Sequence, residues 1–115
     1  MNNNIKEFTV VFAAVKYKDG TGSKERPVYI LRRNETQYRV LRLTSKFTNK
    51  SKKIQDLYFE IKDWREAGLR KPSWIDTVQG YDLPGNISMR YIGLLTDRDT
   101  QRLFKFIDGR TDLFD

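Results

Sequence analysis

The sequence has no cysteine and no histidine among its 115 residues. The first absence excludes disulfides, thiolate nucleophiles and thiolate zinc sites, and the second removes the commonest general base and metal ligand. No apolar run approaches the roughly 18 residues that a membrane span needs, and the N-terminal MNNNIKEF has no basic segment leading into an apolar one. We therefore expect a cytoplasmic protein with a single domain over residues 1–115, no cofactor, no metal and no membrane contact.

Positive charge, in contrast, is abundant and unevenly distributed along the chain, which carries a net charge of +7. Twelve Lys and Arg residues stand against three Asp and Glu residues between Lys16 and Lys53, whereas residues 54–115 contain nine and eleven. A basic half of this kind is typical of a surface that binds a polyanion, with nucleic acid as the first candidate. The alternative is a surface whose charge only keeps the protein soluble, and charge alone does not separate the two.

Short runs rich in β-branched and aromatic residues predict a series of strands. We expect strands over residues 8–17, 27–33, 37–47, 56–61, 73–78 and 88–95. Residues 54–61 also fit a helical face, but the short, β-rich DLYFEI favours a strand. Between the strands, we expect a single helical turn over residues 63–68, ended by Gly68, and a turn over residues 81–86.

The one longer helix is predicted over residues 96–109, with Thr96 as its cap and Asp99 at the third position. Leu103, Phe104 and Ile107 would form its buried face, and Gly109 would end it. Several short strands without alternating helices, followed by one terminal helix, are typical of a mainly β protein. We therefore expect a small, highly curved antiparallel sheet or barrel.

Polar residues lie beside three of the predicted strand ends. They are Lys24-Glu25-Arg26, Thr44-Ser45-Lys46 and Pro72-Ser73-Trp74. In a small barrel such ends can meet at one rim, where an arginine fork, a hydroxyl and further cations would bind phosphate without histidine. Arg26 would supply the fork, held by the rigid backbone at Pro27, and Thr44 the hydroxyl. The alternative is that Arg26 is an ordinary solvated residue at the end of a loop.

Four motifs in a fixed order, GSKERPVYIL, LRLTSKF, GLRKPSWIDT and YIGLLTDRDTQRL, cover the chain from about Val11 to Phe106. In this order they resemble the MazF/PemK-like family of bacterial endoribonuclease toxins. The resemblance implies an SH3-like antiparallel β-barrel with a C-terminal α-helix. It also implies metal-independent cleavage of single-stranded RNA at short sequence motifs, a homodimer, and neutralisation by a cognate antitoxin.

By the same resemblance, the catalytic arginine of the family corresponds to Arg26, its catalytic threonine to Thr44, and a serine at the start of a rim strand to Ser73. The chain departs from the family where Lys24-Glu25 replaces a frequent glycine, and its first strand lacks the usual Gly-Asp opening. Both departures concern the first loop, and hence the choice of target, more than the chemistry.

In the expected reaction the 2′-OH of the RNA attacks the adjacent phosphorus and gives a 2′,3′-cyclic phosphate and a free 5′-OH. Arg26 would stabilise charge on the phosphate oxygens, Thr44 would assist by a hydrogen bond, and Glu25 is a candidate for the general base. The predicted RNA contacts are Lys24, Ser45, Lys46, Lys50, Lys52, Lys53 and Ser73. The alternative function is a non-catalytic barrel that binds nucleic acid or a protein partner.

Aromatic residues make up 13% of the chain, which is more apolar surface than one small interior readily covers. This surplus, like the resemblance, predicts a two-fold dimer, with Trp64, Trp74 and residues 110–115 as the expected contacts. The alternative is that both tryptophans cover the barrel core. In the dimer, one RNA could run along a groove shared by both subunits, and an acidic antitoxin tail would cover the same groove.

Overall fold

The first three strands form an antiparallel meander to which the rest of the sheet is attached. The computed structural model describes residues 5–16 and 22–115. Its elements are β1 (Thr9–Lys16), β2 (Ser23–Arg33), β3 (Gln37–Thr44), α1 (Lys52–Gln55), β4 (Tyr58–Glu60), β5 (Trp74–Asp76), β6 (Tyr81–Pro84), β7 (Met89–Leu94), α2 (Asp97–Phe106) and a 3₁₀ turn at Thr111–Leu113. None of the helices in this part of the chain is long and apolar enough to cross a bilayer.

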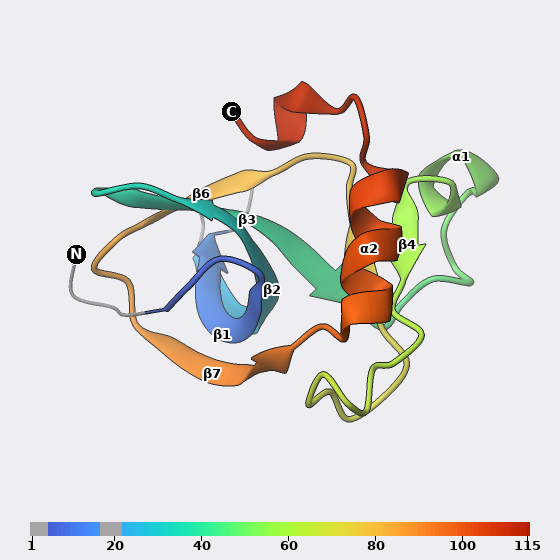
Figure 1. Cartoon of the computed structure of the whole chain (residues 1–115), viewed down its shortest axis with the longest axis horizontal. Coiled ribbons are helices and arrows are strands. Elements are labelled where there is room, and N and C mark those ends of the chain that lie inside the picture. Colours follow the sequence, from blue (N-terminus) through green and yellow to red (C-terminus); the bar gives the residue numbers. More distant parts are fainter. Residues whose placement is uncertain (1–4, 17–21) are drawn as a thin grey trace.

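In the part of the chain that the structure describes, the sheet contains seven strands, and the protein is mainly β, as predicted. Six of the strands follow the order β4-β5-β3-β2-β1-β7, and β6 pairs with β3 outside this order. Every strand pair is antiparallel. β3 is the central strand because it pairs with β2, β5 and β6. Figure 1 shows α2 in front of the half of the molecule that holds β4, while β1, β2 and β6 lie in the other half.

The start of β2 differs from the prediction. The strand begins at Ser23, so Lys24, Glu25 and Arg26 belong to it, and the predicted start at Pro27 is wrong. Pro27 pairs with Phe12 of β1, whereas the pairing of β2 with β3 begins only at Val28. Proline, which has no N–H, fits a position where one side of the strand is open. The loop was predicted over residues 18–25, and its first half, residues 18–21, lies outside the described residues.

The predicted turn over residues 81–86 is also wrong in its first part, which is the strand β6. Val40 pairs with Tyr81 and Gln37 pairs with Pro84. Leu83 is buried and Asp82 is exposed, so this short segment shows the alternation of a strand. The Pro-Gly pair at its end, a turn signal, concealed that alternation.

Residues 52–61 contain both a short helix and a short strand, so each of the two alternatives predicted for residues 54–61 is correct for part of that segment. Residues 52–55 form the short helix α1, whose first turn is capped by Ser51, since the Ile54 N–H donates to Ser51 Oγ at 3.3 Å. The favoured strand is confirmed only over Tyr58–Glu60. The strands predicted over residues 37–47 and 73–78 are likewise shorter than expected.

Both faces of the meander are buried, each by a different cluster. On β2, Tyr29 and Leu31 face one cluster and Val28 and Ile30 face the other. α2 and the residue that follows it cover the first cluster: Leu103 and Ile107 are buried as predicted, whereas Phe104 is half-buried. The burial of both faces explains why residues 27–31 of β2 are a continuous apolar run.

The helical turn predicted over residues 63–68 is confirmed. The Ala67 N–H donates to Asp63 O at 3.1 Å, and Gly68 ends the turn with φ of 87°. The turn is pressed against β7, because a Cβ atom on Gly93 would lie only 2.3 Å from Ala67 O. Gly93 is therefore needed for this close approach.

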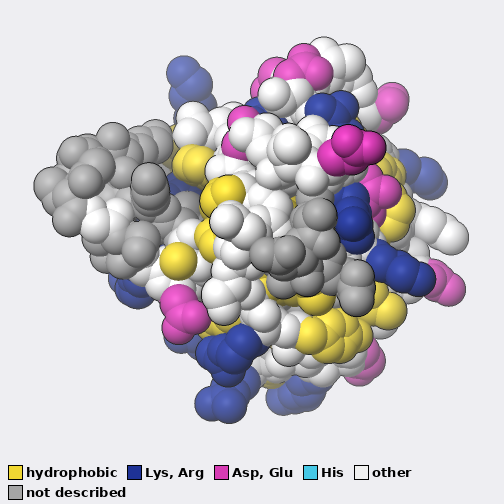
Figure 2. All heavy atoms as spheres, turned by 90° about the vertical axis from the view of Figure 1, so that its left-hand side faces the viewer, with side chains coloured by type: hydrophobic (Ala, Val, Ile, Leu, Met, Phe, Trp, Pro, Cys, Tyr) yellow, Lys and Arg dark blue, Asp and Glu magenta, His cyan; other side chains and the backbone are white. Residues whose placement is uncertain are grey.

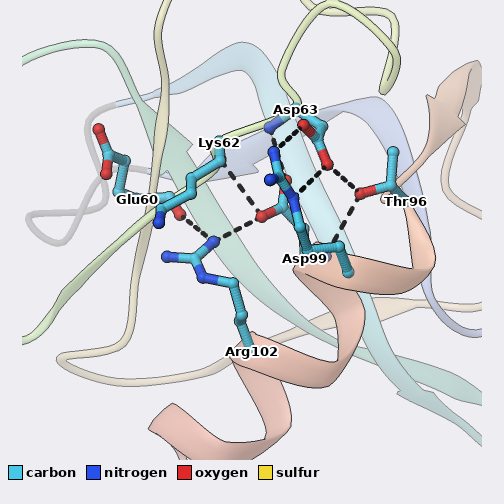
Figure 3. Close-up of polar contacts among 7 residues, drawn as sticks. Glu60, Lys62, Asp63, Thr96, Asp99 and Arg102 are labelled. Carbon is cyan, nitrogen blue, oxygen red and sulfur yellow. Dashed lines mark hydrogen bonds and ion pairs between the residues drawn. The ribbon is translucent and has the colours of Figure 1, made fainter.

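Thr96 caps α2 as predicted, and its Oγ1 accepts from the Asp99 N–H at 3.3 Å. Asp99 does not reciprocate as in a capping box. Its fully buried carboxylate accepts instead from the backbone N–H groups of Lys62 and Asp63, at 3.3 Å and 2.7 Å (Figure 3). Arg102 donates to Asp99 and also to Glu60 O at 3.2 Å. These bonds attach α2 to residues 60–63.

Candidate functional site

The three polar segments singled out in the sequence meet at one depression of about 320 Å³. We call it the cationic depression. Its walls come from β2, from the end of β3 and from the segment that precedes β5. The residues that line it are Lys24, Glu25, Arg26, Pro27, Leu43, Thr44, Ser45, Lys46, Lys71 and Ser73.

Arg26 and Thr44 are brought together by the register of β2 and β3. The pairing of β2 with β3 runs from Arg33 and Tyr38 to Val28 and Arg42, which are the last pair. Arg26 and Thr44 each lie two residues beyond this pair, where β2 and β3 no longer pair with each other and pair instead with β1 and β5. Side chains two positions apart in a strand share a face, so Arg26 and Thr44 project from the same face of neighbouring strands.

The cationic depression holds four cations, Lys24, Arg26, Lys46 and Lys71, and Glu25 is its one carboxylate among the described residues. Arg26 is half-buried, and within the described chain its guanidinium forms no hydrogen bond or ion pair. An excess of unpaired cations in a hollow attracts anions and leaves their donors free for phosphate oxygens.

Arg42, on the same strand face as Thr44, is in a different situation. Its guanidinium lies 3.6 Å from Asp76 and 4.6 Å from the centre of the Tyr81 ring. Its charge is therefore already partly balanced within the protein, and Arg26 is the arginine left for a ligand.

The hydroxyl of Thr44 is placed to donate. Thr44 Oγ1 accepts a hydrogen bond from the Lys46 N–H at 3.1 Å. A hydroxyl can accept and donate at once, so this contact fixes the oxygen and leaves its own proton for a ligand in the depression.

Ser73 lies in the depression, but its hydroxyl is otherwise engaged. Ser73 Oγ donates to Lys71 O at 2.9 Å, and only 7% of the residue is exposed. Its position favours a role in shaping the turn that brings Lys71 to the depression over a direct donation to RNA.

Three of the predicted RNA contacts are not among the lining residues. Lys50 belongs to the turn after Phe47, and Lys52 and Lys53 lie on α1. Lys52 forms an ion pair with Asp56. Of the predicted contacts, Lys24, Ser45, Lys46 and Ser73 line the cationic depression, while the α1 lysines form a separate basic group.

Two features of the site were not singled out in the sequence. Lys71 lines the depression, and its signal was its place two residues before Ser73 in GLRKPSW. The second is an aromatic pair, because Phe47 and Trp74 stack with ring centres 4.8 Å apart and planes 9° apart. Their separation along the chain gave no signal, since the contact depends on the β3–β5 pairing of Thr44 with Trp74.

The residues expected at a dimer contact have roles within this chain. Trp64 packs against the first core cluster and Leu113 is completely buried in it. Large exposed hydrophobic residues occur elsewhere and include Tyr91 and Leu94 on β7, which are 60% and 54% exposed. Figure 2 shows an exposed group of hydrophobic side chains on the lower half of one face, with Lys and Arg side chains nearby.

Comparison of the chain with protein-family models and with curated proteins gives no match.

Proposed function

We propose that this protein is a MazF/PemK-like toxin of a type II toxin–antitoxin system, a metal-independent endoribonuclease that cleaves single-stranded RNA in the cytoplasm. The observation that carries the proposal is the cationic depression, in which an unpaired Arg26 and the hydroxyl of Thr44 share a face beside Lys46 and Lys71. These groups match the needs of phosphoryl transfer, which depends mainly on positioning and on stabilising charge.

In the proposed reaction, the scissile phosphate lies in the cationic depression and the ribose 2′-oxygen attacks its phosphorus. The bond to the 5′-oxygen breaks and this oxygen takes a proton from water, so the products are a 2′,3′-cyclic phosphate and a 5′-OH end. The Arg26 fork donates to the non-bridging oxygens as their charge grows, and Thr44 donates a further hydrogen bond. Among the described residues Glu25 is the one carboxylate of the lining and the candidate for accepting the 2′-OH proton; it is exposed and lies on the opposite face of β2 from Arg26.

The proposal extends to the fold and the partners. The curved sheet would be an SH3-like barrel, two copies would form a homodimer, and an acidic segment of a cognate antitoxin would cover the cationic depression. Light scattering tests the dimer: the expected mass is twice the 13.7 kDa of one chain. A monomer that cleaves RNA would contradict a groove shared by two subunits.

The test of the proposed activity is incubation of the purified protein with a long single-stranded RNA in excess EDTA. We expect discrete cuts that Arg26→Ala abolishes. Loss of cleavage on chelation of the wild-type sample would contradict the metal-independent route. RNA that is bound but left intact would favour the alternative, a barrel that binds nucleic acid without cutting it.

A further inference from the structure

A second depression of about 370 Å³ adjoins the cationic depression, and Ser73 lines both. We call it the tryptophan depression. Its lining includes Trp64, Trp74, Pro72, Glu60 and Lys62. The shared residue places the two depressions side by side.

We propose that the tryptophan depression binds one nucleobase of the RNA, adjacent to the phosphate held beside Arg26. This inference rests on the proposed function and adds the part of the site that selects sequence. Aromatic side chains beside a cationic groove are the usual means of holding single-stranded nucleic acid, because bases stack on them.

Trp74 is suited to stacking because it is already fixed in orientation. Its indole stacks on Phe47 at 4.8 Å, which occupies one side, and it also lines the tryptophan depression. The indole is half-buried and the pair is braced by Tyr58, whose ring lies 6.5 Å from that of Phe47. A fixed aromatic surface loses little side-chain entropy when a base stacks on it.

The wall of the depression that holds Glu60 and Lys62 is fixed by the bonds of α2. Asp99 accepts from the Lys62 and Asp63 N–H groups, and Arg102 donates to Glu60 O. Figure 3 shows the side chains of Glu60 and Lys62 extending to the same side, away from the Asp99 carboxylate. The backbone of this wall is therefore held, while an acidic and a basic side chain remain exposed for a ligand.

The pair of Glu60 and Lys62 indicates which bases fit. A carboxylate accepts from a base amino group, and an ammonium donates to a base carbonyl or ring nitrogen. Cytosine, guanine and adenine each carry an amino group beside a carbonyl or ring-nitrogen acceptor, whereas uracil has no amino group. We therefore expect cytosine, guanine or adenine, and not uracil, in the tryptophan depression.

The experiment uses six-residue oligouridylate probes with one central position changed to C, G, A or an abasic unit. All probes are 2′-O-methylated, so the nucleophile is blocked and binding is read without cleavage. Quenching of tryptophan fluorescence gives the affinity. We expect the C, G and A probes to bind at least about fivefold more tightly than the U and abasic probes.

Glu60→Ala and Trp74→Ala should remove this preference, so that all probes bind with the same affinity. Glu66→Ala, an exposed change of the same kind outside the lining residues, is the matched control and should keep the preference. If Trp74→Ala unfolds the protein, Glu60→Ala decides alone, because its side chain is exposed. Equal affinity of the wild type for all probes, or a preference that Glu60→Ala leaves intact, would overturn the inference.

The two proposals fail in different ways. Base-dependent binding by a protein that cuts no RNA would support the base site and contradict the endoribonuclease. Cleavage whose positions are unchanged in Glu60→Ala and Trp74→Ala would support the endoribonuclease and contradict the base site.

Discussion

Arg26 and Thr44 stand on the neighbouring strands β2 and β3, two positions beyond the pair formed by Val28 and Arg42, and both line the cationic depression. Each has a group left for a ligand. Arg26 has no ion-pair partner among the described residues, and Thr44 accepts from the Lys46 N–H while keeping its own proton. The predictions below separate what these two residues do from what the surrounding charge does.

Replacing Arg26 should abolish cleavage without unfolding the protein. We expect Arg26→Ala to lower the single-turnover rate by about 100- to 1,000-fold, the usual cost of removing one group that stabilises transition-state charge. Arg26→Lys keeps the charge but loses the planar fork, so it should recover only part of the rate. The melting temperature should stay unchanged, because the side chain is half-buried and has no described partner. A lysine variant as fast as the wild type would contradict a role for the fork.

Thr44 should contribute through its hydroxyl. We expect Thr44→Val, which keeps the shape and removes the hydroxyl, to lower the cleavage rate by about 10- to 100-fold, since a hydrogen bond to a charged group is lost. Thr44→Ser is the matched variant and should stay close to the wild type. Equal rates for the valine and serine variants would show that the hydroxyl takes no part.

Binding of RNA should weaken steeply with salt, because cations that contact phosphates displace counterions. Each phosphate contact on single-stranded RNA contributes about 0.7 to the slope of log affinity against log salt. Lys46→Ala and Lys71→Ala, both in the cationic depression, should each reduce the slope by about this amount. A slope near zero for the wild type would contradict phosphate binding.

Lys50 and the two lysines of α1 provide a separate measurement of how far the RNA extends. Lys50→Ala and Lys53→Ala should reduce the salt slope only if the RNA continues from the depression to α1, as predicted from the sequence. Lys52→Ala tests the effect of a cation that is already paired with Asp56. We expect its change to be the smallest of the three.

Asp63 should make the stability depend on acid pH. Hydrogen bonds from Arg98, and then from Thr96, lower the pKa of the Asp63 carboxyl below its ordinary value. A lowered folded-state pKa means that this contribution is present above the unfolded value of about 3.9 and is lost as the pH falls through the folded-state pKa. Asp63→Asn should therefore lower the melting temperature at pH 7, and the difference from the wild type should shrink below about pH 4.

The control for this experiment is Glu35→Gln, an exposed change in the turn between β2 and β3. It should leave the pH dependence unaltered. A difference between Asp63→Asn and the wild type that stays constant from neutral to acid pH would show that the ion pair does not stabilise the fold.

Much of the fold could be predicted because local patterns and tertiary packing agree. The cap at Thr96, the turn ended by Gly68 and the β-rich central strands follow local rules that the packing keeps. β6 was missed because its Pro84-Gly85 end carries a turn signal while its pairing with β3 is set by distant residues. The early start of β2 depends on β1, which pairs with residues before Pro27.

The candidate site could be predicted in part for the same reason. Arg26, Thr44 and Ser73 stand beside strand ends, and antiparallel pairing brings those ends together. The α1 lysines were grouped with them on charge alone, but the chain turns away after Phe47. The stack of Phe47 on Trp74 arises from strand pairing, and no local pattern signals it.

The central claim is that the 2′-OH next to the phosphate held by Arg26 and Thr44 is the nucleophile. The most direct test maps one cut on a short RNA and then repeats the reaction, in EDTA, with a single 2′-deoxy residue on the 5′ side of that cut. We predict that the unmodified RNA gives a 2′,3′-cyclic phosphate and a 5′-OH end, and that the deoxy substrate stays intact. Cleavage of the deoxy substrate at the same position, or products with 3′-OH ends, would contradict the account.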